Sequence, residues 1–525
     1  MKLLPIGKQT IRDIINDDLL YVDKTKYIYQ LITKGWSYFL SRPRRFGKSL
    51  LLSTLEEIFL GNKELFKGLW LYTSDYTWKK HPVIRLDFSK QKAENPEQLK
   101  AFLIDELNLI AQNYNISLTK TEYFSKFQEL ILKLAEREKV VILIDEYDKP
   151  IIDWLEEPEL AGKMRSVLKG FFSVLKGNDA HIRFLLLTGV SKFSKAGVFS
   201  DLNHLKDITM HNEYSSMLGI TEEELKLFFK EHIEDFANTE KISIDRLLEK
   251  IRFWYNGYNF SSQGISVYNP FSTLLLFDCK EFKNHWFETG TPTFLVKLMI
   301  DSDYDVMSIP MQIEEILFSS YEIEDLSPTP LLLQTGYLTI KGYNAERMLY
   351  TLDYPNFEVK RAFLSFFAKR FKKREISESV LYNILDALGE NDIDTPISIL
   401  RQLFVGIEYD LHISQEKYYQ TIFYLIFTMM GLKVNTEIKT NLGRIDAVID
   451  DKSIFIFEFK FSDLSKDNTI IPQNSLAEQA LAQIKSKKYY EKYLHKGKEI
   501  YLIGAAFADR NIGDYLVEKL TSNEN

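Results

Sequence analysis

The hydrophobic pattern of the first 220 residues predicts strands that alternate with helices. The clearest run covers residues 139–146, where consecutive apolar positions end in Asp145 and Glu146. A run that is apolar on both faces is typical of a strand buried in a parallel sheet. Three further runs have the same character: residues 36–41, 82–88 and 183–190. We therefore expect residues 1–220 to form an α/β domain around a parallel sheet.

From residue 221 onwards the spacing of apolar positions becomes helical. Glu224 follows Thr221 three residues later, which predicts a capping box at the start of a helix. We expect residues 221–405 to form a helical lid and a linker region. Two aromatic, turn-rich segments, 254–258 and 268–272, are expected to pack this lid against the core rather than to stack on a ligand.

A pair of strands is predicted near the end of this middle region. The strands cover residues 336–340 and 347–353, and residues 341–344 are expected to close the turn between them. Because helices precede the pair, the pattern suits a winged helix around residues 320–360.

The last part of the chain, residues 406–525, predicts a smaller α/β domain. Two strands are expected on either side of a turn at residues 450–452, the first with Asp446 and the second with Glu458 and Lys460. The other predicted elements are a helix at 414–430, a strand at 432–438, a helix at 476–493 and a strand at 498–506.

The segment between the first strand and the following helix has the features of a phosphate-binding loop. Residues 42–49 read Arg-Pro-Arg-Arg-Phe-Gly-Lys-Ser, and Arg42 stands where this motif has its first glycine. The helix start offers unpaired N–H groups and the positive end of its dipole to a phosphate. We expect Lys48 to reach the terminal phosphates and Ser49 to bind Mg²⁺. The predicted nucleotide-binding positions of the loop are Arg45, Phe46, Gly47, Lys48, Ser49 and Leu50.

Polar residues at the ends of two other buried runs complete this predicted site. Ligands bind at the carboxyl ends of strands in open α/β sheets. We expect Asp145 to hold Mg²⁺, directly or through water, and Glu146 to polarise the attacking water. Thr188 stands where a sensor residue would touch the γ-phosphate region. Each run alone could be an ordinary strand, but the three in this order indicate a nucleotide site.

Carboxylates and a lysine come together in the predicted C-terminal domain. Glu458 and Lys460 lie two residues apart on one strand, so their side chains point to the same face. Such triplets are common on exposed strands, but the flanking residues here are apolar, and an unpaired charge among them would be costly. The residues that this domain can gather around one site are Glu416 or Glu437, Asp446, Glu458, Lys460 and Gln483.

The predicted chemistry of this second site is metal-dependent hydrolysis. The carboxylates would bind Mg²⁺, which activates water and offsets charge on a scissile phosphate. Lys460 would stabilise the charged transition state or orient the water.

The composition of the chain limits which cellular compartments and which binding partners are expected. The single cysteine, Cys279, excludes an internal disulfide and fits a reducing cytoplasm. We find no signal peptide and no apolar run long enough to span a bilayer, so no membrane partner is expected. Because the formal net charge is −8, a nucleic acid would have to meet a local basic patch. Residues 369–374 are one candidate, although a solvated helix face is the more ordinary interpretation of that run.

These motifs resemble those of bacterial AAA-ATPase-like proteins fused to a C-terminal PD-(D/E)xK nuclease-superfamily domain. The matching segments extend over nearly the whole chain: residues 21–25, 39–49, 143–148, 188–191, 336–340, 443–446 and 458–460. The resemblance implies a P-loop ATPase domain with a helical lid, followed by a restriction-endonuclease-like domain. It assigns nuclease roles to Asp446, Glu458 and Lys460, and Gln483 matches the family's helical glutamine. In this family the first glycine of the phosphate loop is commonly absent.

The resemblance also implies cofactors and partners. ATP and Mg²⁺ are the expected cofactors, with Mn²⁺ as an alternative at the nuclease site. Nucleic acid, DNA more readily than RNA, is the expected partner. ATPases of this class often complete a site with a neighbour's arginine, which leaves a homo-oligomer open, but the sequence does not identify such an arginine.

Three functions stay open at this point. The protein is an ATP-regulated nuclease, a nucleotide-dependent switch that binds nucleic acid or a partner without cutting, or a scaffold with two inactive sites. The third is the least favoured, because an inactive nuclease site should have lost Asp446 or Lys460, and both are present.

Overall fold

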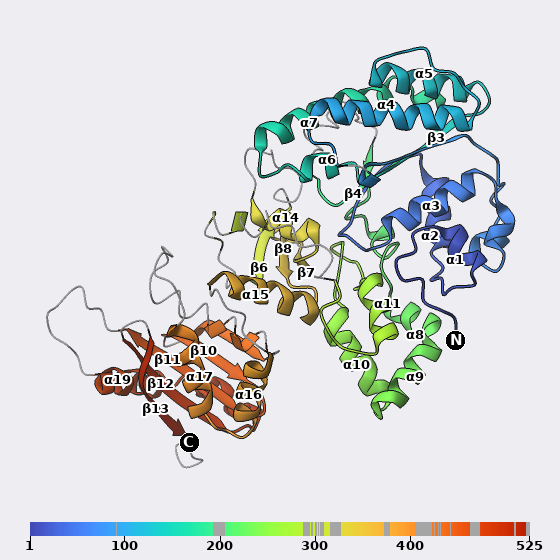
Figure 1. Ribbon diagram of the computed structural model, residues 1–525. Coiled ribbons are helices and arrows are strands. Elements are labelled where there is room, and N and C mark those ends of the chain that lie inside the picture. Colours follow the sequence, from blue (N-terminus) through green and yellow to red (C-terminus); the bar gives the residue numbers. More distant parts are fainter. Residues whose placement is uncertain are drawn as a thin grey trace. The chain divides into compact units, whose positions relative to one another are not determined.

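The computed structural model describes residues 1–90, 92–192, 205–286, 295, 298–299, 302, 304, 309–315, 327–371, 378–405, 423–424, 426–428, 430, 432–440, 443–461, 473–508 and 511–520. Its contacts divide the chain into two compact units, Met1–Val359 and Lys360–Asn525, and each is described by itself (Figure 1). The predicted division of the chain at residues 220 and 405 stays a prediction.

A five-stranded sheet lies at the centre of the first unit. Its strands are β1 (Ser37–Ser41), β2 (Val83–Asp87), β3 (Val140–Asp145), β4 (Ile182–Gly189) and β5 (Lys206–Asp207). Their order is β2-β3-β4-β1-β5, and every pairing is parallel. β3 is buried along its whole length, which is why its sequence has no polar face. The predicted α/β fold with a parallel sheet is therefore confirmed.

Helices surround this sheet in two groups. They are α1 (Ile11–Asn16), α2 (Thr25–Lys34), α3 (Lys48–Phe59), α4 (Pro96–Asn113), α5 (Tyr123–Ala135), α6 (Lys149–Ile152) and α7 (Pro158–Lys176). Figure 1 shows α4, α5 and α7 together, and α1, α2 and α3 apart from them, with β3 and β4 between the groups. The rings of Phe127 and Phe171 stack at 4.4 Å between their centroids and join α5 to α7.

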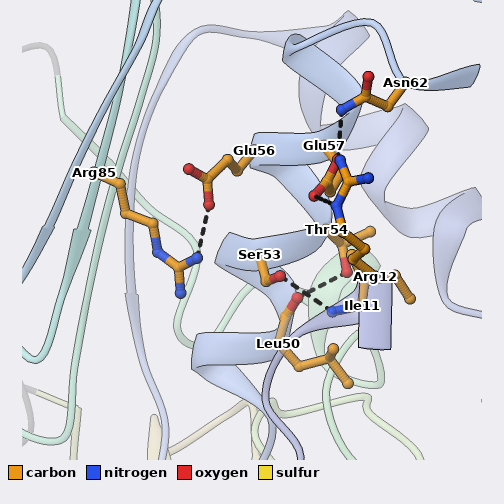
Figure 2. A network of polar contacts seen from close by, with 9 residues as sticks. All are labelled: Ile11, Arg12, Leu50, Ser53, Thr54, Glu56, Glu57, Asn62 and Arg85. Atoms are coloured by element: carbon orange, nitrogen blue, oxygen red, sulfur yellow. Dashed lines mark hydrogen bonds and ion pairs between the residues drawn. The ribbon is translucent and has the colours of Figure 1, made fainter. Parts of the chain in front are cut away.

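Polar contacts fix α3, the helix that follows the phosphate loop, to its neighbours (Figure 2). Arg12 of α1 donates two hydrogen bonds to Glu57, at 2.9 and 2.7 Å. Arg85 of β2 donates to Glu56 at 2.7 Å. The hydroxyl of Ser53 accepts the first backbone N–H of α1 at 3.1 Å. Because α3 is tied to both α1 and the sheet, its N-terminus has a defined position at the end of β1.

The middle of the chain begins with four helices that share a core with the N-terminal segment. They are α8 (Glu222–Phe228), α9 (Lys230–Glu240), α10 (Ile244–Tyr255) and α11 (Pro270–Cys279). The predicted capping box at Thr221 and Glu224 is present. Leu20 packs in the same hydrophobic cluster as Ile220 and Leu276, so the helical region and the segment before β1 form one body.

A small antiparallel sheet follows. It contains β6 (Met311–Glu314), β7 (Thr339–Asn344) and β8 (Leu349–Asp353) in the order β6-β8-β7, with α14 (Pro328–Thr335) before β7 and α15 (Phe357–Phe371) after β8. The predicted turn at residues 341–344 is wrong, because these residues continue β7 and Tyr343 pairs with Tyr350. The chain reverses after Asn344 instead. The winged-helix interpretation stays a prediction.

The second unit contains a mixed five-stranded sheet. Its strands are β9 (Lys433–Thr440), β10 (Gly443–Asp450), β11 (Ile454–Phe461), β12 (Ile500–Ala508) and β13 (Asn511–Lys519), and its helices include α16 (Glu378–Gly389), α17 (Asp394–Val405) and α19 (Gln473–Ser486). The order is β13-β12-β11-β10-β9, and only β11 and β12 pair in parallel among neighbours. This arrangement agrees with the predicted nuclease-like fold.

Two details of the second unit differ from the prediction. The helix expected to reach residue 493 ends at Ser486, and the chain then turns through Lys488, whose φ is 48°. β13 was not predicted, because its exposed and buried positions alternate only weakly. The helix expected at 414–430 lies mostly outside the described residues.

Candidate functional sites

The phosphate loop joins β1 to α3 as its sequence predicts. Its backbone is left-handed at Arg45 (φ 67°) and at Gly47 (φ 92°), the residue directly before α3. Glycine adopts this conformation at little cost, whereas arginine rarely does. The loop therefore turns so that the first N–H groups of α3 and the positive end of its dipole face the loop, as phosphate binding requires.

The side chain of Lys48 is buried and folded back over the loop. Its Nζ donates to the carbonyl oxygens of Arg42 at 2.9 Å and Pro43 at 3.1 Å. Burial lowers the pKa of Lys48, while nearby carboxylates oppose this effect, Glu146 most strongly. The ammonium group is thus satisfied by the loop itself and lies close to the acids that end β3.

The other predicted loop residues have different surroundings. Ser49 is half-buried at the second residue of α3, and Phe46 is buried. The exposed guanidinium of Arg45 lies 4.9 Å from the centre of the Phe271 ring. Because Phe46 and Arg45 use their side chains for contacts within the protein, their backbone is what remains for a phosphate.

The two carboxylate oxygens of Asp145, the acid at the end of β3, differ in their hydrogen bonds. Asp145 is 1% exposed. Its Oδ1 accepts from the Thr188 hydroxyl at 2.7 Å and from the N–H of Glu146 at 3.1 Å. Its buried Oδ2 has no hydrogen-bond partner among the residues that the structure describes. A buried carboxylate oxygen without a donor is costly, so this atom fits a Mg²⁺ ion or a water molecule bound to it.

Glu146, next to this acid, has an unusual backbone. Its φ is 46°, a left-handed conformation that is uncommon for residues other than glycine, asparagine and aspartate. Burial raises the pKa of its carboxyl group, and the positive charge of Lys48 opposes that shift. Strained backbone and a carboxyl pKa above its ordinary value are both frequent where a general base is positioned.

Sequence reasoning missed Asp148, two residues further along. Its Oδ2 accepts from the N–H groups of Val190 (3.0 Å) and Ser191 (2.6 Å) and from the Ser191 hydroxyl at 2.8 Å. These bonds tie the segment after β3 to the end of β4. The signal was present, because the motif that contains Asp145 also contains Asp148 and the motif of Thr188 continues to Ser191.

Arg42, the residue in place of the motif's first glycine, has a structural role. Its guanidinium is buried and donates to the carbonyl oxygens of Ser41, Thr209 and Tyr214. It also lies 4.2 Å from the centre of the Phe260 ring. Burial lowers its pKa to about 9. The arginine therefore anchors the start of the loop where a glycine would leave the backbone free.

The middle region packs directly on the loop. Phe46 contacts the rings of Tyr258 and Phe260, at 4.9 and 5.2 Å between centroids. Trp286 donates from Nε1 to the carbonyl oxygen of Arg44 at 3.3 Å. The prediction that segment 254–258 packs on the core is confirmed. Phe260 and Trp286 were missed, because nothing local in their sequence indicates this distant contact.

An apolar cavity opens beside the N-terminus of α3. Leu50 and Gly47 form one side, and the other sides come from the segment before β1, the segment before α8 and α11. The main apolar residues of these sides are Pro5, Leu20, Val22, Ile220, Pro270 and Leu274. A cavity of this character, next to a phosphate loop, suits the flat base of a nucleotide. The sequence did not predict this cavity, because its walls come from four separate parts of the chain.

Four predicted residues of the second unit come together around β11. Lys460 donates from Nζ to Oε1 of Gln483 at 2.6 Å and lies 3.4 Å from Oε1 of Glu458. Gln483 donates from Nε2 to the same Glu458 oxygen. In the adjacent β10, Asp446 accepts the N–H of Phe459 at 2.7 Å. Two carboxylates, an ammonium and an amide thus form one patch.

Glu458 is the most buried charged group of this patch, and its electrostatics reflect that burial. Its side chain is 3% exposed, and its Oε2 has no hydrogen-bond partner in the described part of the chain. Burial, followed by the negative charge of Asp446, raises the pKa of Glu458 to about 7. A divalent cation would offset both effects, so the donor set of these two carboxylates fits Mg²⁺ or Mn²⁺.

The structure gives less information on the two other predicted metal ligands, Glu437 and Glu416. Glu437 lies on β9 between Thr436 and Ile438, which pair with Ala447 and Ile445 on β10, so its backbone lies beside Asp446. Glu416 lies outside the described residues. Within the part of the chain that the structure describes, three or more His, Cys, Asp or Glu side chains do not gather as a metal cluster.

Gly504 lets α19 reach this patch. A Cβ at this position would lie 2.5 Å from both the carbonyl oxygen of Ala477 and the backbone N of Leu481. Only glycine permits that approach between α19 and β12. Because Gly504 pairs with Glu458 across the sheet, the approach brings Gln483 onto the carboxylate.

Two family models match the chain in this order. Residues 5–199 match a predicted AAA-ATPase, and residues 414–513 match the PD-(D/E)XK nuclease superfamily. The chain therefore joins an AAA-ATPase-like domain to a PD-(D/E)XK nuclease-superfamily domain, as its motifs indicated.

A curated protein from Azotobacter chroococcum mcd 1, "Uncharacterized protein in vnfD 5'region", is 39% identical over 538 residues, which cover 99% of both chains. The protein belongs to the same family as this relative. Among its described helices, none is long and apolar enough to cross a membrane.

Proposed function

We propose that the protein is an ATP-regulated, Mg²⁺-dependent nuclease that cleaves phosphodiester bonds of nucleic acid, DNA rather than RNA. The observation that carries this proposal is the convergence of Asp446, Glu458, Lys460 and Gln483 on neighbouring elements. A bound Mg²⁺ or Mn²⁺ ion would activate water and offset charge on the scissile phosphate. Asp446 and Glu458 would hold it, with Glu437 or Glu416 as a further ligand.

The residues of this patch have separate tasks in the proposed reaction. Lys460 would stabilise the negative charge that develops on the phosphate. Gln483 bridges Lys460 and Glu458, and so it would keep both groups in a fixed orientation. Burial of Glu458 limits the access of bulk water, which strengthens these electrostatic interactions.

The proposed control by ATP depends on the phosphate loop. Lys48 would exchange its bonds to loop carbonyls for bonds to phosphate oxygens, while Ser49 and Asp145 would hold Mg²⁺. Glu146 would accept a proton from the attacking water, and Thr188 keeps Asp145 in position. The apolar cavity beside Leu50 would take the base.

Cleavage of a mixed DNA and RNA panel with Mg²⁺ or Mn²⁺, with and without ATP, tests the proposal. We expect Asp446→Asn to lower the cleavage rate by about 100-fold or more, because the metal loses one of two described carboxylates. Asp451→Asn is the matched control, since Asp451 lies at the turn that follows β10. Equal rates for wild type and Asp446→Asn would show that any observed cleavage comes from elsewhere.

The second candidate function is a nucleotide-dependent switch whose second unit binds nucleic acid or a partner without cutting it. The packing of Phe260 and Trp286 on the phosphate loop favours this candidate, because a change in the loop would reach the middle region. Nucleic-acid binding without cleavage, under all metal and ATP conditions, would support the switch over the nuclease.

A further inference from the structure

The phosphate loop contains three arginines, and their guanidinium groups have three different environments. Arg42 is buried and bonded to backbone carbonyls, and Arg45 is exposed beside the Phe271 ring. Arg44 is half-buried, and its guanidinium makes no hydrogen bond or ion pair with any residue that the structure describes. A half-buried guanidinium that makes no hydrogen bond within the described part of the chain can donate its N–H groups to a bound anion.

The backbone of Arg44 has a fixed position, although its guanidinium has no described partner. Its carbonyl oxygen accepts from Trp286 at 3.3 Å. On either side, the ring of Pro43 packs against Gly336, where a Cβ would lie 2.8 Å from the proline Cβ, and Arg45 is held in the left-handed conformation. The side chain of Arg44 therefore starts from a defined point on the loop.

That point lies at the phosphate end of the site. Lys48, the residue expected at the terminal phosphate, donates from Nζ to the carbonyl oxygen of Pro43 at 3.1 Å, and Arg44 directly follows Pro43 in the loop. The cavity for the base is lined by Gly47, Leu50 and other residues, and Arg44 is not among its described lining residues. A phosphate bound at the loop could therefore pair with both cations, Lys48 and Arg44.

We propose that Arg44 binds the terminal phosphate of ATP and is a catalytic residue for its hydrolysis within the same chain. This inference rests on the proposed ATP-binding function. In the reaction, the water oxygen bonds to the γ-phosphorus while the bond to the β–γ bridging oxygen breaks. Glu146 accepts the water proton, and ADP leaves with the electron pair of the broken bond. The planar guanidinium matches the phosphate oxygens and stabilises the charge that they carry in the transition state.

The test compares ATP and ADP binding, because only ATP has the phosphate that Arg44 would contact. Titration of the full chain with Mg²⁺ and either nucleotide, by calorimetry, should show that Arg44→Ala weakens ATP binding by about tenfold and leaves ADP binding within about twofold. Arg44→Lys should retain part of the ATP affinity. Arg246→Ala, on the exposed surface of α10, is the control, and thermal melting of each variant checks that it folds.

The same titrations separate failure of this inference from failure of the proposed function. If wild type binds neither nucleotide, the proposed ATP function is wrong, and the role of Arg44 is wrong with it. If wild type binds both and Arg44→Ala binds ATP as wild type does, only the inference is overturned. An equal loss of ATP and ADP affinity would also overturn it, because Arg44 would then shape the loop rather than contact the terminal phosphate.

Discussion

At the scale of single residues, the carboxyl group of Glu458 makes the stability of the second unit depend on pH. Its pKa rises from 4.5 to about 7 on folding, so the folded chain keeps a proton that the unfolded chain loses within this window. Stability from Glu458 is therefore present below about pH 4.5 and is lost as pH rises towards about 7. Glutamine stays neutral, so Glu458→Gln should raise the melting temperature more at about pH 8 than at about pH 5, by a few degrees.

The measurement is a thermal melt of the full chain at both pH values, without divalent metal. Glu478→Gln is the matched control, because Glu478 is exposed on α19. Mg²⁺ added at the higher pH should stabilise wild type and not Glu458→Gln, since the cation needs the carboxylate. A gain in melting temperature that is the same at both pH values would contradict the expected environment of Glu458.

At the scale of elements, the contact between α19 and β12 places the glutamine of the nuclease patch. Gly504→Ala should move α19 away from the sheet, because its Cβ would meet backbone atoms at 2.5 Å, and backbone cannot rotate aside as a side chain can. We expect a loss of about 1–3 kcal/mol in stability and weaker Mn²⁺ binding. Thermal melting measures the first effect, and metal titration measures the second. Gly389→Ala is the control, since its Cβ would meet only the flexible end of Lys452, at 3.5 Å. Unchanged melting and metal binding in Gly504→Ala would refute this account.

The elements also show which parts of the molecule were predictable. β3 and the phosphate loop were predicted, because burial on both faces and the Gly-Lys-Ser sequence leave local signals. The anchoring of Arg42 was not, because its partners Thr209, Tyr214 and Phe260 are far away in the sequence. Local patterns describe elements and motifs, whereas cavities and anchoring contacts depend on tertiary packing.

In the nuclease patch, the residues were predictable from the sequence, but their contacts were not. Glu458 and Lys460 could be placed on one face from their spacing alone. Their bridge through Gln483 depends on the close approach at Gly504, and a glycine in a strand does not by itself identify what lies above it. The helix that ends at Ser486 was predicted too long, because Lys488 adopts a positive φ that its residue type does not indicate.

At the scale of the whole molecule, the proposed function requires the phosphate loop of the first unit to control a reaction in the second unit. Lys48→Ala should abolish the effect of ATP on cleavage and leave the ATP-free rate within about twofold, because the lysine belongs to the nucleotide site alone. Its loss also leaves the carbonyl oxygens of Arg42 and Pro43 without the donor that Lys48 supplies. We therefore expect the first unit to lose about 1–3 kcal/mol of stability and to melt at a lower temperature. Lys230→Ala, at the exposed start of α9, is the control.

Cleavage rates with and without ATP, measured beside ATP binding, decide between coupling and independence of the two sites. A ligand shifts an equilibrium only by its difference in affinity for the two states. If ATP activates the nuclease by strengthening its binding to nucleic acid, the nucleic acid must strengthen ATP binding by the same factor. An ATP effect that survives in Lys48→Ala would place the control outside this loop. Nucleic acid that leaves the ATP affinity of wild type unchanged would mean that ATP does not control the nuclease through binding.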